Sequence, residues 1–384
     1  MPLRRYLFLM TAFFFTIGYA TGYAQNVPVI KANSTKADIR EDGKLTKGAW
    51  VISPAEKKDI YPTSGKRVTF YTDIDSISFA VDPAVGTYDF VILVNGKDSA
   101  HTQVKYDAGY RQPQPPSAAD IRRVIEGQIY SFKIPKVEIF KMEDRVVMNG
   151  KDSIRVRIYY PAAGKSKRVI YNIHGGALIA CDLETHDNIS RILANKTGAI
   201  VVALDYRKPP EYPYPAGLDD CGVVLNWIKA NAVSFGGDPK NLVLLGDSGG
   251  GLFIACLEVR WREKIGARAV VLINPATDLR NYDQGPYGYV TKMYLGDHDA
   301  NDSLVSPLAA RDFSYFPPTL IITSEKDPLR SQGVDFFKKL SAAGVNAKTV
   351  DMPGLGHLGG FWAAGHPKAD SAIAETVNFL GTAP

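Results

Sequence analysis

The pattern of hydrophobic and polar positions changes character near residue 140 of the chain. Between residues 25 and 110, apolar and polar positions alternate, and turn pairs such as Asp82-Pro83 and Asn95-Gly96 interrupt the alternation. Such alternation is typical of strands with one buried face, so it predicts a small all-β, sandwich-like N-terminal domain. The strands expected in it are Val68–Tyr71, Ser76–Val81, Tyr88–Val94 and Thr102–Tyr106.

Residues 140–384 carry a different pattern, in which short runs that are apolar throughout alternate with segments of helical periodicity. Strands that are apolar on both faces predict a mostly parallel sheet covered by helices on both faces, an α/β fold. The expected strands are Ile154–Tyr160, Val169–Ile173, Ala199–Leu204, Leu242–Leu245, Ala269–Ile273, Leu320–Thr323 and Lys348–Met352. The expected helices are Glu184–Lys196, Ala216–Ala232, Gly250–Ile265, Ser331–Ala343 and Lys368–Leu380.

Residues 111–139 separate these two patterns. The stretch Gly109–Pro116 is rich in proline and polar residues, which predicts a linker. A helical pattern over Ser117–Tyr130 follows it. We therefore expect a linker and one helix between a β-rich domain at 25–110 and an α/β domain at 140–384.

The first 24 residues have the layout of a secretory signal peptide. Arg4 and Arg5 form a basic start, Leu7–Ala20 is apolar, and the small residues Gly22 and Ala24 precede a predicted cleavage site. An uncleaved anchor is the alternative, but the apolar run is shorter than the roughly 20 residues that span a bilayer. We expect an exported protein, periplasmic or extracellular, with no stable membrane anchor after processing.

Composition excludes some classes of function. Charged residues make up 22% of the chain and the formal net charge is +5, with no basic stripe interleaved with aromatic residues, so nucleic-acid binding is not expected. The three cysteines, Cys181, Cys221 and Cys256, lie in apolar periodic segments and are expected as buried free thiols, with one disulfide as the alternative. The oligomeric state is left open.

The stretch LGDSGGGL, residues 245–252, contains a candidate nucleophile, Ser248. Its core, GDSGG, occurs around the serine of chymotrypsin-like proteases and also fits G-x-S-x-G, the nucleophile elbow of α/β-hydrolases. An apolar run over Asn241–Leu245 precedes it and a helical pattern follows, which is the strand–turn–helix context of the elbow. Gly246 and Gly250 keep this sharp turn free of side chains.

A candidate acid and a candidate base follow Ser248. Asp327 and His357 each come just after an apolar run, and the order serine, aspartate, histidine is that of α/β-hydrolases. In chymotrypsin-like proteases the serine comes last, so that interpretation fails. Glu325 is the alternative acid and His366 the alternative base. His101, His186 and His298 are expected to be structural.

Upstream, His174-Gly175-Gly176-Ala177 follows the predicted strand Val169–Ile173. Adjacent glycines leave backbone N–H groups accessible to a ligand. An oxyanion hole needs such donors together with the N–H after the nucleophile, so Gly175, Gly176 and Gly249 are its predicted donors. Acyl transfer of this kind requires no metal and no organic cofactor.

Five ordered motifs resemble the hormone-sensitive-lipase-like family of α/β-hydrolase serine esterases. HGGA resembles the family's HGGG, GDSGGG resembles GDSAGG, and GLGHLGGF resembles GxxHGF; residues 205–220 and 306–330 resemble two further family segments. The resemblance covers about residues 140–384 and implies Ser248 as nucleophile, Asp327 as acid and His357 as base. The chain departs from the family pattern at Ala177, Gly249 and Leu358.

The resemblance also implies a lid over the site. Ser117–Tyr130 is the candidate lid helix, and residues 280–305 are a candidate second piece. Tyr206 and Arg207 are expected to organise a loop rather than to react. The β-rich N-terminal part has no counterpart in the resemblance, and packing, export stability or carbohydrate contact are its candidate roles.

These observations predict an exported serine carboxylesterase that hydrolyses esters of short-chain or small acyl groups through an acyl-enzyme. A carbohydrate esterase, which removes acetyl or feruloyl groups from polysaccharide, is the alternative enzyme. A non-catalytic binding protein on a hydrolase fold is the alternative class. The expected partner is a small-molecule or oligosaccharide ester.

Overall fold

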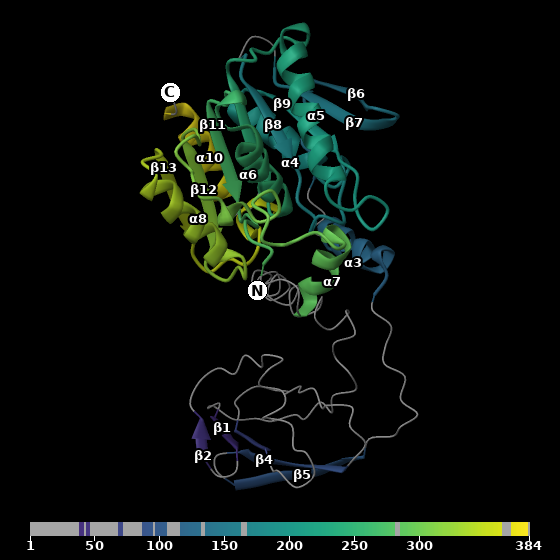
Figure 1. Ribbon diagram of the computed structural model, residues 1–384, viewed down its shortest axis with the longest axis vertical. Coiled ribbons are helices and arrows are strands. Elements are labelled where there is room, and N and C mark those ends of the chain that lie inside the picture. The colour runs from purple at the N-terminus through teal and green to yellow at the C-terminus, as the bar shows by residue number, and fades with distance from the viewer. Residues whose placement is uncertain are drawn as a thin grey trace. The chain divides into compact units, whose positions relative to one another are not determined.

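The computed structural model of the chain has two compact units, one within Gly18–Pro115 and one within Pro116–Pro384 (Figure 1). The structure describes residues 38–41, 44–46, 68–71, 87–94, 97–105, 116–131, 135–162, 167–280, 285–362 and 370–382. The predicted signal peptide, residues 1–24, lies outside the described residues. Over the described residues, no helix is both long enough and apolar enough to span a membrane.

The described strands of the N-terminal unit form one five-stranded sheet, in the order β2-β1-β3-β4-β5. Its strands are β1 (Asp38–Glu41), β2 (Lys44–Thr46), β3 (Val68–Tyr71), β4 (Thr87–Val94) and β5 (Lys97–Lys105). Three of them cover strands expected from alternation. The expected strand Ser76–Val81 lies outside the described residues. A sandwich needs two packed sheets, whereas the described strands of this unit form a single sheet. The sandwich therefore stays a prediction.

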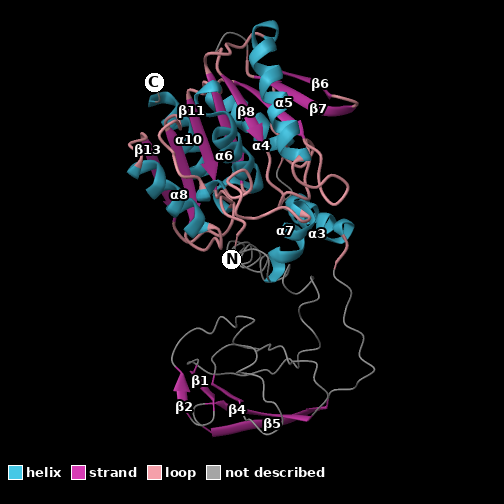
Figure 2. Ribbon diagram, viewed as in Figure 1, coloured by secondary structure: helices cyan, strands magenta, loops and turns pink. Residues whose placement is uncertain are grey.

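The larger unit is built on an eight-stranded sheet, in the order β13-β12-β11-β10-β8-β9-β7-β6 (Figure 2). Its strands are β6 (Lys141–Asn149), β7 (Asp152–Tyr160), β8 (Val169–Ile173), β9 (Ile200–Asp205), β10 (Leu242–Asp247), β11 (Ala269–Ile273), β12 (Thr319–Ser324) and β13 (Ala347–Met352). Strands β8 to β13 run parallel, whereas β7 is antiparallel to β9 and β6 to β7. The sheet is therefore mostly parallel, as predicted.

Strand β6 is an addition to the predicted sheet. It forms a hairpin with β7 around Asn149-Gly150, where Gly150 has φ +60°. Seven of the strands were expected from the sequence, whereas most side chains of β6 are exposed and only Val147 is buried. Because burial on both faces produces the apolar run, an exposed edge strand does not show one.

Helices cover both faces of this sheet. They are α3 (Ala118–Ser131), α4 (Asp187–Thr197), α5 (Ala216–Asn231), α6 (Gly249–Trp261), α7 (Gly285–Leu295), α8 (Arg330–Ala342), α9 (Gly359–Trp362) and α10 (Asp370–Thr382). The apolar faces of α5, α6 and α8 enter one core cluster, and those of α4 and α10 enter another. Alternate residues of each central strand serve the two clusters, which explains why these strands are apolar throughout.

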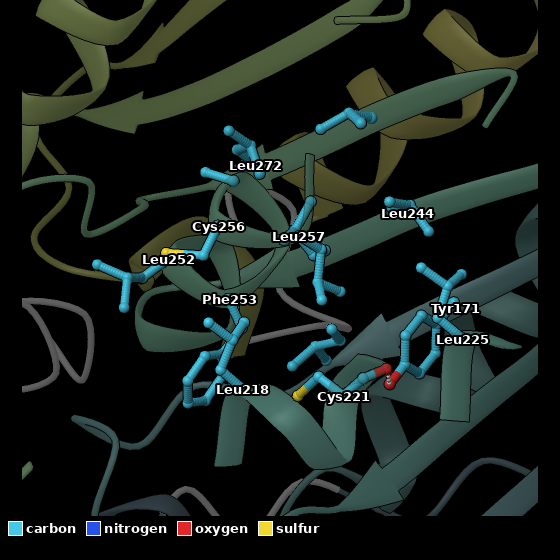
Figure 3. Packing of buried hydrophobic residues seen from close by; sticks show 14 of the residues in the cluster. Tyr171, Leu218, Cys221, Leu225, Leu244, Leu252, Phe253, Cys256, Leu257 and Leu272 are labelled. Carbon is cyan, nitrogen blue, oxygen red and sulfur yellow. Dashed lines mark hydrogen bonds between the residues drawn. The ribbon is translucent and has the colours of Figure 1, made fainter. Parts of the chain in front are cut away.

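The first of these clusters contains two of the cysteines (Figure 3). Cys221 of α5 and Cys256 of α6 are fully buried among leucine side chains, and the hydroxyl of Tyr171 donates a 2.9 Å hydrogen bond to the carbonyl of Cys221. Cys181 is buried near α3. All three thiols are free, in agreement with the expectation. Burial raises the pKa of Cys221 well above its ordinary value, so this thiol stays protonated.

Candidate active site

Ser248 stands at the junction of β10 and α6, at the carboxyl edge of the parallel strands. Its backbone has φ +51°, a left-handed conformation that is strained for a residue with a side chain. The turn is too tight for side chains on either side. A Cβ at Gly246 would lie 2.6 Å from the backbone of Gly250, and one at Gly250 would lie 1.9 Å from the carbonyl of Ile173. Both glycines are thus required by close approach, as the elbow interpretation demands.

The structure brings the two downstream candidates to Ser248. His357 follows β13, and its Nε2 lies 3.0 Å from Ser248 Oγ. Asp327 follows β12, and its Oδ2 lies 2.9 Å from His357 Nδ1. All three side chains are buried, with the histidine 9% exposed. The arrangement lets His357 accept the serine proton at Nε2 while Nδ1–H donates to the carboxylate.

Asp327 is held in place by two further hydrogen bonds. Asn274 Nδ2 donates to Asp327 Oδ2 over 2.5 Å, and the backbone N–H of Leu329 donates to Oδ1 over 2.8 Å. Asn274 follows β11 with φ +46°, and Ser324 also contacts its side chain, at 3.1 Å. Asn274 was not among the site residues predicted from the sequence. The available signal was its position directly after an apolar strand and before Pro275, at the sheet edge that carries the other site residues.

The alternative acid Glu325 has a different partner from the Ser248 site. Glu325 Oε2 accepts a 2.6 Å hydrogen bond from the N–H of Gly354. His298 Nε2 lies 2.8 Å from Asp302 at an exposed position. His101 lies on β5 of the N-terminal unit, and His366 lies outside the described residues.

The predicted oxyanion loop lies against the nucleophile. A Cβ at Gly175 would lie 3.0 Å from Ser248 Cβ, and one at Gly176, where φ is +118°, would lie 2.2 Å from the carbonyl of Ala180. The carbonyl of Gly176 accepts hydrogen bonds from the N–H groups of Ile179 and Ala180, at 3.1 and 2.9 Å. Only glycine fits at these two positions, because each backbone passes within contact distance of its neighbours.

Tyr206 contacts this loop and helps to hold its shape, as expected from the sequence. Its buried hydroxyl donates to the carbonyl of His174 over 3.0 Å, and its ring stacks on the imidazole at 4.3 Å. Burial lowers the pKa of His174 well below its ordinary value, and Lys208 and His186 act in the same direction. His174 is therefore a neutral, structural part of the loop. Arg207, also expected to be structural, pairs with Asp220 at 2.8 Å.

Asp247, the residue before the nucleophile, has a histidine partner. It is fully buried, and its Oδ2 lies 3.5 Å from His186 Nε2. The other ring nitrogen of His186 lies 3.1 Å from the hydroxyl of Thr185. His186 thus belongs to the support of the elbow, at the start of α4, and its structural role matches the expectation.

Helix α3 coincides with the helix expected at 117–130 and packs beside the oxyanion loop. Ile121 and Ile125 of α3 share a small apolar cluster with residues 179–181 of that loop and with Val290 of α7 (Figure 1). Arg122 ties the helix down through a 2.9 Å hydrogen bond to the carbonyl of Ile179 and a salt bridge to Glu211 at 2.6 Å. Elements from both predicted lid segments therefore meet at this loop.

The polar side chains at Ser248 have the chemistry of acyl transfer. Over the part of the chain that the structure describes, no group of three or more histidine, cysteine, aspartate or glutamate side chains is placed to hold a metal ion. The polar groups at Ser248 are its hydroxyl, the imidazole of His357 and the carboxylate of Asp327, joined by hydrogen bonds in that order.

Comparison with known proteins places this geometry in a family. The profile of a family described as alpha/beta hydrolase fold matches residues 170–363. The chain is 32% identical over 265 residues to the carboxylesterase NlhH of Mycobacterium tuberculosis, covering 63% of this chain and 83% of that protein. The chain belongs to the hormone-sensitive-lipase-like family of α/β hydrolases. It is a carboxylic ester hydrolase.

Other relatives have the same activity. An arylesterase of Saccharolobus solfataricus is 31% identical over 254 residues, covering 62% of this chain and 83% of that protein. The solved structure of EstE1, a carboxylesterase from a metagenomic library, superimposes with a TM-score of 0.63 at 29% identity and covers 69% of this chain and 98% of that chain. These relatives show the fold and the class of reaction.

Two departures from the family motifs fall at left-handed backbone positions. Ala177, at the third position of the HGGG-like motif, has φ +52°, and Leu358, directly after His357, has φ +55°. Glycine adopts such angles without strain, whereas a side chain costs about 1–2 kcal/mol. This explains why a glycine suits both positions, although nothing in the structure explains why this chain replaces it.

Proposed function

We propose that this carboxylesterase acts through Ser248, His357 and Asp327 and an acyl-enzyme intermediate. The observation that carries the proposal is the pair of contacts at one imidazole, 3.0 Å from Nε2 to Ser248 Oγ and 2.9 Å from Nδ1 to Asp327 Oδ2. His357 takes the hydroxyl proton as Ser248 Oγ attacks the ester carbonyl. Asp327 orients the imidazole and stabilises the imidazolium that forms. The protonated His357 then gives its proton to the departing alcohol.

The negative charge that develops on the carbonyl oxygen is assigned to backbone donors. Gly175 lies against Ser248, Gly176 follows it in the same loop, and Gly249 is the first residue of α6, where helix N–H groups favour negative charge. A water molecule, activated by His357, then attacks the acyl-enzyme, and Ser248 regains its proton when the acid leaves. No metal or organic cofactor takes part in these steps.

Small acyl esters are the proposed substrates. Among the relatives of this chain are the arylesterase of Saccharolobus solfataricus and an ethyl acetate hydrolase of Pseudomonas putida. The second is 30% identical over 226 residues. Ethyl acetate has small groups on both sides of the ester bond, which is consistent with a buried nucleophile beside an apolar cluster of α3 and α7.

The proposal is tested with Ser248→Ala and 4-nitrophenyl acetate. Hydrolysis should fall to the rate of the reaction without enzyme, and a fluorophosphonate probe should label the wild-type protein at Ser248 alone. Ser234→Ala is the matched control, because Ser234 is exposed and donates only to the carbonyl of Asn231. Retained turnover in the Ser248 variant would refute the assignment. A wild-type protein that ignores the probe would favour a binding function instead.

We further propose export and a separate β domain. Arg4 and Arg5, the apolar run Leu7–Ala20 and the small residues before Gln25 support cleavage after Ala24. The five-stranded sheet within Gly18–Pro115 supports a distinct N-terminal domain. Mass spectrometry of the protein from its native host should find a mature chain that begins at Gln25. An intact N-terminus in the cytoplasmic fraction would contradict export.

A further inference from the structure

Strand β6 is an edge of the eight-stranded sheet and leaves one of its sides open. It pairs with β7 over its whole length, from Lys141 opposite Tyr160 to Asn149 opposite Asp152, and no other described strand pairs with it (Figure 1). An edge strand carries backbone N–H and C=O groups that can pair with another strand. Nine residues in regular register make this edge long enough to do so.

One face of β6 carries an apolar stripe in contact with solvent. The β6 stripe, as we call it, consists of Phe140, Met142, Val146 and Met148, which are 63%, 37%, 62% and 58% exposed. Phe140 directly precedes β6 and the other three lie within it; all four stand at even-numbered positions and so share one face. On the opposite face Val147 is 5% exposed and enters the core. Four exposed large apolar side chains in one row mark an interaction surface.

Asp144 interrupts the β6 stripe at its centre, but its charge is compensated. Arg157 Nε and Nη2 contact the two oxygens of Asp144 at 2.6 and 2.9 Å. The strand is also balanced in charge, because Lys141 and Arg145 offset Glu143 and Asp144. The β6 stripe and the balanced charges of β6 suit a partner strand with the same arrangement of apolar and charged residues.

We propose that β6 pairs antiparallel with β6 of a second copy of this chain, with the two-fold axis at Asp144. In that register Met142 faces Val146 of the partner subunit, and Phe140 faces Met148 of the partner subunit. The two stripes then lie side by side on one face of the joined sheet. On the other face Glu143 is opposite Arg145 of the partner subunit, and the symmetry repeats this attraction.

Neighbouring registers lose this complementarity. An axis at Arg145 sets the two Arg145 side chains against each other and Asp144 against Val146. An axis at Glu143 opposes the two Glu143 side chains and sets Asp144 against Met142. The axis at Asp144 also opposes two like side chains, the Asp144 carboxylates, but each of these retains its own Arg157 partner. It is the axis that joins apolar to apolar along the stripe and sets Glu143 against Arg145.

The first test is the mass of the wild-type protein in solution. Analytical ultracentrifugation over a protein concentration range of about a hundredfold should show a monomer–dimer equilibrium. Val146→Lys should abolish the dimer and leave the hydrolysis of 4-nitrophenyl acetate unchanged. Val233→Lys is the control, because Val233 is 74% exposed but lies outside β6, in the turn after α5. A monomeric wild type, or a dimer that survives Val146→Lys, would overturn the proposal.

The second test reads the charge register. Glu143→Arg and Arg145→Glu should each weaken the dimer at least about tenfold, because like charges then face each other across the axis. An equimolar mixture of the two variants should form a heterodimer, since every opposing pair in it is again acid against base. The double variant should also dimerise. If the mixture stays monomeric while both variants are folded, the register is wrong.

The third test reads the position of the axis. Directly opposed residues in antiparallel strands have Cα atoms about 4.5–5.5 Å apart, within reach of a disulfide. Asp144→Cys should therefore give a covalent dimer on mild oxidation. Val146→Cys is the control, because its thiol would lie about four residues along the strand, roughly 13 Å, from its counterpart. Equal cross-linking of both variants would exclude an axis at Asp144.

Discussion

Asn274 Nδ2 donates to Asp327 Oδ2 over 2.5 Å, on the same oxygen that His357 Nδ1 contacts at 2.9 Å. The amide therefore sets the position of the carboxylate that orients the histidine. It comes from the end of β11, whereas Asp327 follows β12, so the parallel pairing of these two strands brings the amide to the acid. We assign Asn274 as a positioning residue of the site.

Asn274→Ala should lower kcat and leave KM nearly unchanged. Loss of a hydrogen bond to a charged group costs about 1.5–3 kcal/mol, which corresponds to a roughly ten- to hundredfold slower reaction. Steady-state kinetics with 4-nitrophenyl acetate measures the split, and circular dichroism checks the fold. Asn274→Asp should be slower still, because it sets a second carboxylate against Asp327. If both variants had the same kcat and KM as the wild type, Asn274 would have no positioning role in the reaction.

Gly249 has less space around it than the sequence suggests. A Cβ at this position would lie 2.9 Å from Leu178 Cδ2 and 3.2 Å from the backbone nitrogen of Leu178. Gly249→Ala should therefore slow hydrolysis modestly, by about two- to fivefold, because Leu178 must shift beside the oxyanion loop. The double change with Leu178→Ala should recover part of the rate. Gly249→Pro should be far slower, because it removes an N–H donor.

Arg122 fixes α3 to two loops at the site through the carbonyls of Ile179 and Pro209 and the carboxylate of Glu211. Arg122→Ala should raise KM several-fold with a smaller effect on kcat, since the contacts hold the walls of the site and do not touch the reacting atoms. Arg123→Ala is the matched control. Arg123 is exposed on the same helix and pairs with Asp120 one turn away. An unchanged KM in Arg122→Ala would show that α3 does not shape substrate binding.

Glu258 is a buried acid that carries no role in the proposed reaction. It lies in α6, its Oε1 has no hydrogen-bond partner, and burial raises its pKa from 4.5 to about 8. The folded state therefore binds a proton that the unfolded state releases. Below pH 4.5 both states are protonated, and the free energy of unfolding falls as the pH rises from there to about 8.

Glu258→Gln should remove this pH dependence. The variant should match the wild type in stability near pH 4.5 and exceed it above pH 8, by on the order of 5 kcal/mol, since each pKa unit corresponds to about 1.4 kcal/mol. Urea unfolding across this pH range measures the difference. Activity at neutral pH should not change. A constant difference between the two proteins at all pH values would show that Glu258 titrates normally.

Much of the fold followed from local pattern. Apolar runs located β8 and β11 to the residue, because a strand buried on both faces is apolar at nearly every position; Asn172 is the exception in β8. Helix α3 was located to within one residue at each end. The edge strand β6 was missed, because a strand with an exposed face has no continuous apolar run. Its mixed charged and apolar residues can be recognised as those of a strand only once β6 is seen at the edge of the sheet.

For the site, the sequence by itself determined which residues are candidates. The elbow around Ser248 and the glycines of the loop at Gly175 are local structures, and the order of Ser248, Asp327 and His357 is a property of the chain alone. Tertiary structure decided which side chains meet. The contacts of Asn274 with Asp327 and of Leu178 with Gly249 join residues far apart in the chain. Their distances depend on how strands and loops pack, and no spacing in the sequence encodes them.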